Sequence, residues 1–77
     1  MREAISIVFI GHFRADSFCE FVDHRARRLQ LDVVMERAGD ERIEVRVAGQ
    51  PDLIDAFEMA CSLGPIDCVV REVERES

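Results

Sequence analysis

The order of strand-like and helix-like segments limits the fold of this sequence more than any other feature. Residues 4–10, AISIVFI, are rich in β-branched and aromatic side chains, which favour a strand. Residues 43–47, IEVRV, alternate apolar and charged side chains, as expected for a strand with one buried face. Residues 31–36, LDVVME, and residues 67–73, DCVVREV, have a similar composition. The sequence therefore predicts four strands.

The segment 17–30 is predicted to form the first helix. Apolar side chains recur there at helical spacing: Phe18, Phe21, Val22, Ala26 and Leu29. Ser17 and Glu20 match a capping box, in which the serine hydroxyl accepts a hydrogen bond from a backbone N–H of the first turn. We therefore expect this helix to begin at Ser17.

A second helix is expected over residues 51–63. Pro51 suits the first turn, and Gly64-Pro65 ends the helix because glycine adopts the left-handed cap and proline cannot continue it. A short AGDE turn joins the second and third strands in an antiparallel hairpin. The order βαββαβ predicts the α+β class, a ferredoxin-like two-layer sandwich with both helices on one face of a four-stranded antiparallel sheet. The expected core is Ile5, Ile7, Phe9, Phe18, Phe21, Val22, Leu29, Val45, Val47, Leu53, Phe57 and Cys61.

Composition limits what the chain can do. Its 77 residues, 48% of them hydrophobic, are expected to form a single domain over residues 1–77. The net charge of −6 argues against nucleic acid and anionic membranes as partners. No apolar run approaches the roughly 18 residues of a transmembrane helix. Three widely spaced cysteines match neither a disulfide framework nor a zinc motif, so we expect a cytoplasmic protein with reduced thiols, as a monomer or weak homodimer.

The segment from Gly11 to Phe21, GHFRADSFCEF, is the candidate binding site. It joins a strand to a helix N-terminus, where backbone N–H groups and the helix dipole attract anions. The possible anion-binding residues are Arg14, Ala15, Asp16, Ser17, Phe18 and Cys19, together with Arg37 from the second strand.

Positions along nearly the whole chain resemble the acylphosphatases, small enzymes that hydrolyse carboxyl-phosphate anhydrides. The first loop of that family reads G-x-V-Q-G-V-G-F-R, and Gly11 and Phe18 stand at its first glycine and its phenylalanine. Residues 26–31, ARRLQL, match the family's helix end A-R-R-L-G-L with one change. The spacing continues without a gap to Gly49 and Gly64-Pro65. The resemblance implies a hydrolase that needs no metal or cofactor.

The catalytic positions of that family are substituted here. The Arg that holds the phosphate falls on Cys19, and the Asn that positions the attacking water falls on Arg37. A cysteine supplies no bidentate cation, and an arginine cannot accept a hydrogen bond from water. The loop's Gln and its two later glycines fall on Arg14, Ala15 and Ser17. We therefore expect a catalytically degenerate acylphosphatase-like domain that binds phosphate weakly. It would act as a small binding or assembly module for a small anion or a protein.

The alternative is that the chain is still an active acylphosphatase. If Arg14 and Arg37 both turned into the former site, they could hold a phosphate from new directions and give an acylphosphatase with a rearranged site. Otherwise both arginines are expected on the solvated rim, paired with Asp16, Glu36 or Glu41.

Cys19 and the histidines suggest further chemistry. A thiol in the first turn of a helix can become nucleophilic when its pKa falls, but Asp16 and Glu20 act in the opposite direction. His12 and His24, taken with Cys19 and Asp16, do not have the spacing of a zinc site. We expect an inert thiol, surface histidines, and neither metal nor cofactor.

Overall fold

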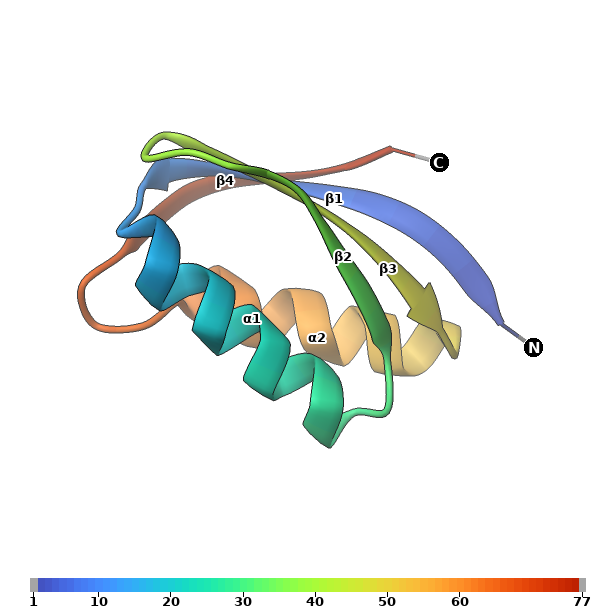
Figure 1. The fold of residues 1–77 in the computed structure, drawn as a ribbon. Helices are drawn as coiled ribbons and strands as arrows, with labels where there is room; N and C mark the ends of the chain where they lie inside the picture. The colour runs from blue at the N-terminus through green and yellow to red at the C-terminus, as the bar shows by residue number, and fades with distance from the viewer. Residues whose placement is uncertain (1, 77) are drawn as a thin grey trace.

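The computed structural model describes residues 2–76 and has the predicted βαββαβ order. The strands pair antiparallel in the order β2-β3-β1-β4, and both helices cover one face of the sheet (Figure 1). The elements are β1 (Glu3–His12), α1 (Ala15–Arg28), β2 (Asp32–Ala38), β3 (Arg42–Gly49), α2 (Pro51–Leu63) and β4 (Val69–Glu76). The predicted α+β ferredoxin-like sandwich is therefore confirmed.

The core lies between the sheet and the two helices. Phe9 from β1 meets Phe18 from α1 edge to face, with ring centroids 5.3 Å apart, a geometry that the ring quadrupoles favour. Of the expected core residues, the structure buries Ile7, Phe9, Phe18, Val22, Val45, Val47, Phe57 and Cys61, while Ile5, Phe21, Leu29 and Leu53 are only partly buried at its border.

Val8 is buried on the other face of the sheet, although strand alternation predicts that it faces solvent. It lies opposite Glu44 on one side and Glu74 on the other, in the two neighbouring strands. Long charged side chains can cover apolar atoms with their aliphatic stems while their heads stay in water. The open face of the sheet therefore contributes one fully buried residue.

The first helix begins earlier than predicted. α1 starts at Ala15 with Arg14 as its N-cap residue, and no side chain caps it, so the capping box predicted for Ser17 and Glu20 is wrong. The Ser17 hydroxyl donates instead to a carboxylate oxygen of Asp67, at 2.9 Å. A tertiary contact has replaced the local capping bond.

The end of α1 is a Schellman motif. The N–H of Leu31 donates to the carbonyl of Ala26, and the N–H of Gln30 donates to the carbonyl of Arg27. Gln30 has a φ of 57°, in the left-handed region that usually belongs to glycine. Leu31 is buried beyond it, which completes the hydrophobic contact typical of this cap.

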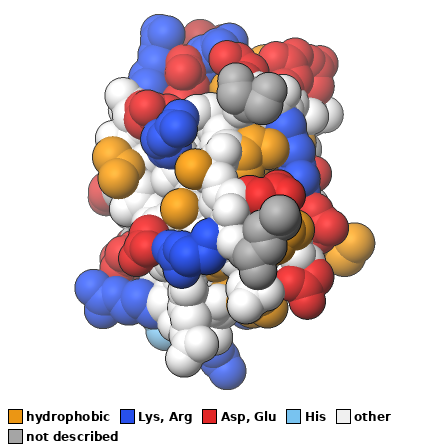
Figure 2. All heavy atoms as spheres, turned by 90° about the vertical axis from the view of Figure 1, so that its right-hand side faces the viewer, with side chains coloured by type: hydrophobic (Ala, Val, Ile, Leu, Met, Phe, Trp, Pro, Cys, Tyr) orange, Lys and Arg blue, Asp and Glu red, His pale blue; other side chains and the backbone are white. Residues whose placement is uncertain are grey.

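Both described ends of the chain lie at the same end of the sheet, opposite the β1–α1 loop (Figure 1). Charged side chains of both signs are spread over this end of the molecule, with apolar atoms between them in small areas (Figure 2). Within residues 2–76, no helix is long and apolar enough to cross a membrane.

Candidate functional site

The β1–α1 connection is very short, because β1 ends at His12 and α1 begins at Ala15. Phe13 is buried and packs against Phe18 with ring centroids 4.8 Å apart. The N–H of Phe13 donates to the backbone carbonyl of Asp40 at 2.7 Å. The N–H of Arg14 points at the sulfur of Cys68, 3.4 Å away. Both N–H groups of the connection are therefore used within the protein.

Asp67, in the loop between α2 and β4, lies at the N-terminus of α1. Its carboxylate accepts the hydrogen bond from Ser17 and lies 3.8 Å from Nε of Arg14. A carboxylate near the start of a helix also interacts favourably with the helix dipole. The chain thus places its own negative group at the candidate anion-binding site.

Arg37, which the resemblance aligns with the family's water-positioning Asn, lies near a different carboxylate. Its guanidinium lies 3.9 Å from Glu44 on β3, and Arg42 holds the same carboxylate at 2.8 Å. The partners predicted for Arg14 and Arg37 are therefore wrong, because register across the sheet and the α2–β4 loop supply nearer carboxylates. The side chains of Arg14 and Arg37 are 69% and 64% exposed, so solvent screens both pairs.

Cys19 is half-buried in the second turn of α1. Burial raises the pKa of its thiol, and the nearby charge of Asp16 raises it further. Both effects keep the thiol protonated at neutral pH, which opposes a nucleophilic role. Cys61 and Cys68 are also free thiols, and both are buried.

The predicted anion-binding residues are only partly brought together. Residues 15–19 form the start of α1, with Phe18 turned into the core, while Arg14 and Arg37 bind to separate carboxylates. Within the described chain, no group of three His, Cys, Asp or Glu side chains is arranged to hold a metal ion.

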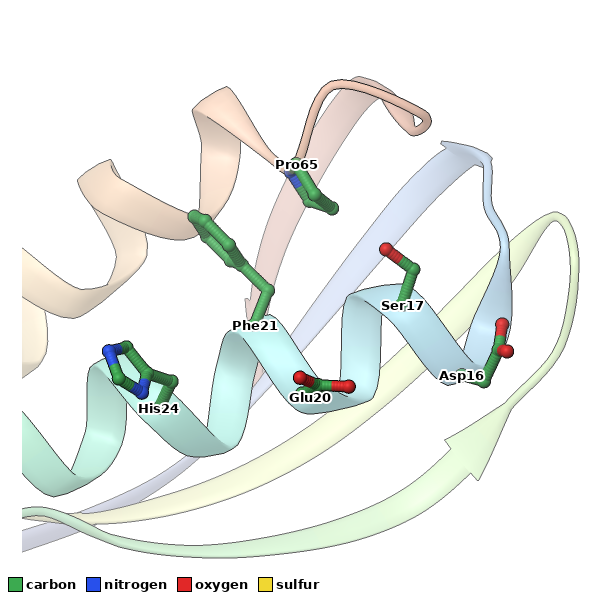
Figure 3. Close-up of a pocket in the computed structure, with 6 residues that line it drawn as sticks. All are labelled: Asp16, Ser17, Glu20, Phe21, His24 and Pro65. Atoms are coloured by element: carbon green, nitrogen blue, oxygen red, sulfur yellow. The ribbon is translucent and has the colours of Figure 1, made fainter.

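A groove runs between α1 and the start of the α2–β4 loop, with a volume of about 510 Å3. Figure 3 shows Phe21 and Ser17 extending from α1 toward Pro65. The groove is lined by Asp16, Ser17, Glu20, Phe21, His24 and Pro65. Sequence reasoning missed the contributions of Pro65 and Asp67, since no local pattern links them to a helix about 50 residues earlier.

Comparisons with solved structures find acylphosphatases. The chain superposes on acylphosphatase from Bacillus subtilis with a TM-score of 0.86 and 21% identity, covering 99% of this chain and 83% of that one. Acylphosphatase from Coxiella burnetii superposes with a TM-score of 0.87 and 24% identity, covering 97% of this chain and 79% of that one. Full-length HypF, solved with phosphate and nucleotide bound, superposes with a TM-score of 0.85 and 21% identity, covering 99% of this chain and 10% of that one. No model of a protein family and no curated protein matches the sequence. The chain therefore has the acylphosphatase fold.

Proposed function

We propose that this chain is an acylphosphatase-fold domain that does not hydrolyse acyl phosphates and acts as a small binding or assembly module. The observation that supports this most directly is the pairing of Arg14 with Asp67 and of Arg37 with Glu44. With Cys19 at the place of the family's phosphate-binding Arg, these are the two cations that the sequence offered as replacements. Each lies near a carboxylate of the chain, and the carboxylate near Arg37 also pairs with Arg42.

Hydrolysis also needs a group that orients water. An amide carbonyl at the Arg37 position would accept a hydrogen bond from the attacking water, whereas a guanidinium has donors only. Cys19 does not replace it, because its protonated thiol is a weak hydrogen-bonding group. Without a group that orients water, we propose that the candidate site binds a ligand or partner and does not hydrolyse it. We place the module in a reducing compartment such as the cytoplasm, since its cysteines are odd in number and widely spaced. We propose that it is a monomer or a weak homodimer.

A rearranged acylphosphatase is the second candidate. The ion pairs of Arg14 and Arg37 are long, at 3.8 and 3.9 Å, and both side chains are largely exposed. Exposed pairs of this kind contribute little free energy, about 0–1 kcal/mol, so an incoming phosphate could compete for either arginine.

Hydrolysis of benzoyl phosphate separates the two candidates. We expect the wild-type rate to equal the spontaneous rate, and the variants Arg14→Ala and Arg37→Ala to leave it unchanged. Turnover well above the spontaneous rate that disappears in Arg37→Ala would establish the enzyme and overturn our proposal.

Restoring the family residues tests the origin of the domain. We expect a variant with Cys19→Arg, Arg37→Asn, Ala15→Gly and Ser17→Gly to hydrolyse benzoyl phosphate detectably. The two glycines stand in the first turn of α1 and should cost roughly 0.5–1 kcal/mol each, so folding must be verified by circular dichroism. A folded but inert variant would remove this support for descent from an enzyme.

Phosphate binding at the loop is expected to be weaker than about 1 mM, because the carboxylates of Asp16, Glu20 and Asp67 oppose an anion there. Amide shifts during a phosphate titration measure this directly. The Asp67→Asn variant should bind more tightly, since it frees Arg14 and removes one charge. Saturation at residues 15–20 below about 1 mM in the wild type would contradict this expectation.

A further inference from the structure

The groove beside α1 combines two carboxylates with an apolar floor. Asp16 and Glu20 are exposed, stand one helical turn apart and both line the groove. Among residues 2–76, neither carboxylate takes part in an ion pair, whereas Asp67, Glu44 and several others do. The groove therefore has negative charge that the described part of the chain does not neutralise.

The floor of the groove is Phe21 and Pro65, both half-buried. The guanidinium of Arg25 lies over the Phe21 ring, 5.0 Å from its centroid, so a cation of the chain already contacts this ring. Two large aliphatic residues close to Pro65 in the chain are almost fully exposed: Leu63, two residues before it, at 82%, and Ile66, directly after it, at 105%. Contiguous apolar surface is typical of interaction sites, and these two residues add aliphatic surface close to Pro65 in the chain.

We infer that this groove binds a short segment of a partner protein in which an arginine or lysine stands beside aliphatic residues. This inference rests on the proposed binding function and names the class of partner. The cation would reach Asp16 and Glu20, and its aliphatic stem would lie along Phe21 and Pro65. The neighbouring aliphatic side chains would cover Leu63 and Ile66.

The negative charge of the chain favours a basic and partly aliphatic segment over other partners. The net charge of −6 attracts a basic segment over the distance of the Debye length, and the same charge repels a second copy of the chain and any nucleic acid. A purely apolar segment would leave the two carboxylates without partners. A purely polar cation would leave the aliphatic residues exposed. The combination of both features is what the groove fits.

Titration of the full chain with short peptides, followed by amide shifts, tests the inference. The probe is acetyl-Arg-Leu-Leu-Arg-amide, and the matched controls replace either both arginines by glutamates or both leucines by serines. We expect saturable shifts at residues 16–24 and 63–67 with the probe, and affinities at least about 10-fold weaker with either control. Equal binding of the glutamate peptide, or shifts elsewhere in the molecule, would overturn the inference.

Charge reversal supplies the variant test. Glu20→Lys should weaken binding of the probe by about 10-fold or more, since it removes one attraction and adds a repulsion. Glu3→Lys changes the net charge equally, but at an exposed position at the other end of β1, and should leave binding within about 2-fold. Ile66→Ser should also weaken binding. Equal effects of Glu20→Lys and Glu3→Lys would refute a site at the groove.

These results separate the inference from the proposed function. Absence of peptide binding together with absence of benzoyl phosphate turnover contradicts only the groove. Turnover of benzoyl phosphate contradicts the binding module itself, whatever the peptide does.

Discussion

Gln30 occupies a backbone conformation that suits another residue. It is the left-handed residue of the Schellman motif that ends α1, and the resembling acylphosphatase motif has glycine at this place. A side chain with a Cβ is strained there by roughly 1–2 kcal/mol, and glycine is not. The backbone geometry of this cap is therefore present here with a residue that adopts it less easily than glycine does.

Gln30→Gly is accordingly expected to stabilise the protein by about 0.5–1 kcal/mol, the relief of strain minus the added entropy of the unfolded chain. Urea unfolding measures the change. Gln50→Gly is the matched control: Gln50 has an ordinary φ of −71°, so glycine relieves no strain there. A loss of stability in Gln30→Gly would mean that the left-handed conformation carries no penalty in this cap.

At the scale of elements, the backbones of β1 and β4 approach closely at Gly11. A bulge between Ile10 and Gly11 shifts the register of this pair, and a Cβ on Gly11 would lie 1.9 Å from the carbonyl oxygen of Val69. The obstacle is backbone, which cannot rotate away as a side chain can. The glycine is thus required by strand packing in this fold as well as by any loop chemistry.

We expect Gly11→Ala to destabilise the protein by about 3 kcal/mol or more, because the strands must separate to admit the methyl group. Thermal and urea unfolding measure it. A Cβ on Gly39 would lie 3.2 Å from its nearest neighbour, the carbonyl oxygen of Arg42, so Gly39→Ala is expected to lose clearly less stability. Comparable losses in the two variants would show that close approach does not explain Gly11.

The contact between α1 and the α2–β4 loop joins two elements through Ser17 and Asp67. Ser17→Ala and Asp67→Ala should each destabilise by about 0.5–1.5 kcal/mol, and the double variant by less than their sum because both remove one hydrogen bond. Ser62→Ala, which removes only a bond to its own helix, is the control. Additive losses would show that the hydrogen bond contributes nothing.

Element types and order could be predicted from the sequence because each segment has the periodicity of its own structure, as IEVRV shows in β3. The start of α1 could not be predicted from the sequence, since the hydroxyl of Ser17 binds Asp67, 50 residues away, instead of capping the helix. Strand alternation alone would place Val8 in solvent, but it is buried opposite Glu44 and Glu74 of the neighbouring strands. For the site, the resemblance implied from the sequence alone that the family's catalytic residues are substituted, but the carboxylates that lie near Arg14 and Arg37 depend on tertiary contacts.

At the scale of the whole molecule, the composition allows the ionisation of the cysteines to be observed at alkaline pH without overlap from other side chains. The chain has no Lys and no Tyr, so thiols are the side chains that ordinarily ionise between about pH 9 and 12. Burial raises the pKa of Cys61 to about 12, and it also raises the pKa of Cys19 and Cys68. A thiol whose pKa is raised by folding leaves stability unchanged while it is protonated in both states, and lowers stability once the unfolded chain ionises.

Stability should therefore be independent of the thiols below about pH 9 and fall above it, since the unfolded state then loses protons that the folded state retains. Cys61 alone contributes a slope of about 1.4 kcal/mol per pH unit up to about pH 12. Urea unfolding at pH 8, 9, 10 and 11 measures the slope. Cys61→Ala should be less stable throughout but show a shallower slope, and an unchanged slope would contradict the assignment to Cys61.

The position of the two described ends affects how the domain can be attached to something else. Both lie at one end of the sheet, while α1 begins and the groove opens at the opposite end. A linker at either terminus would therefore leave the groove accessible. The domain could be fixed to a sensor surface, or fused to a reporter, and still present Asp16, Glu20 and Ile66 to solution.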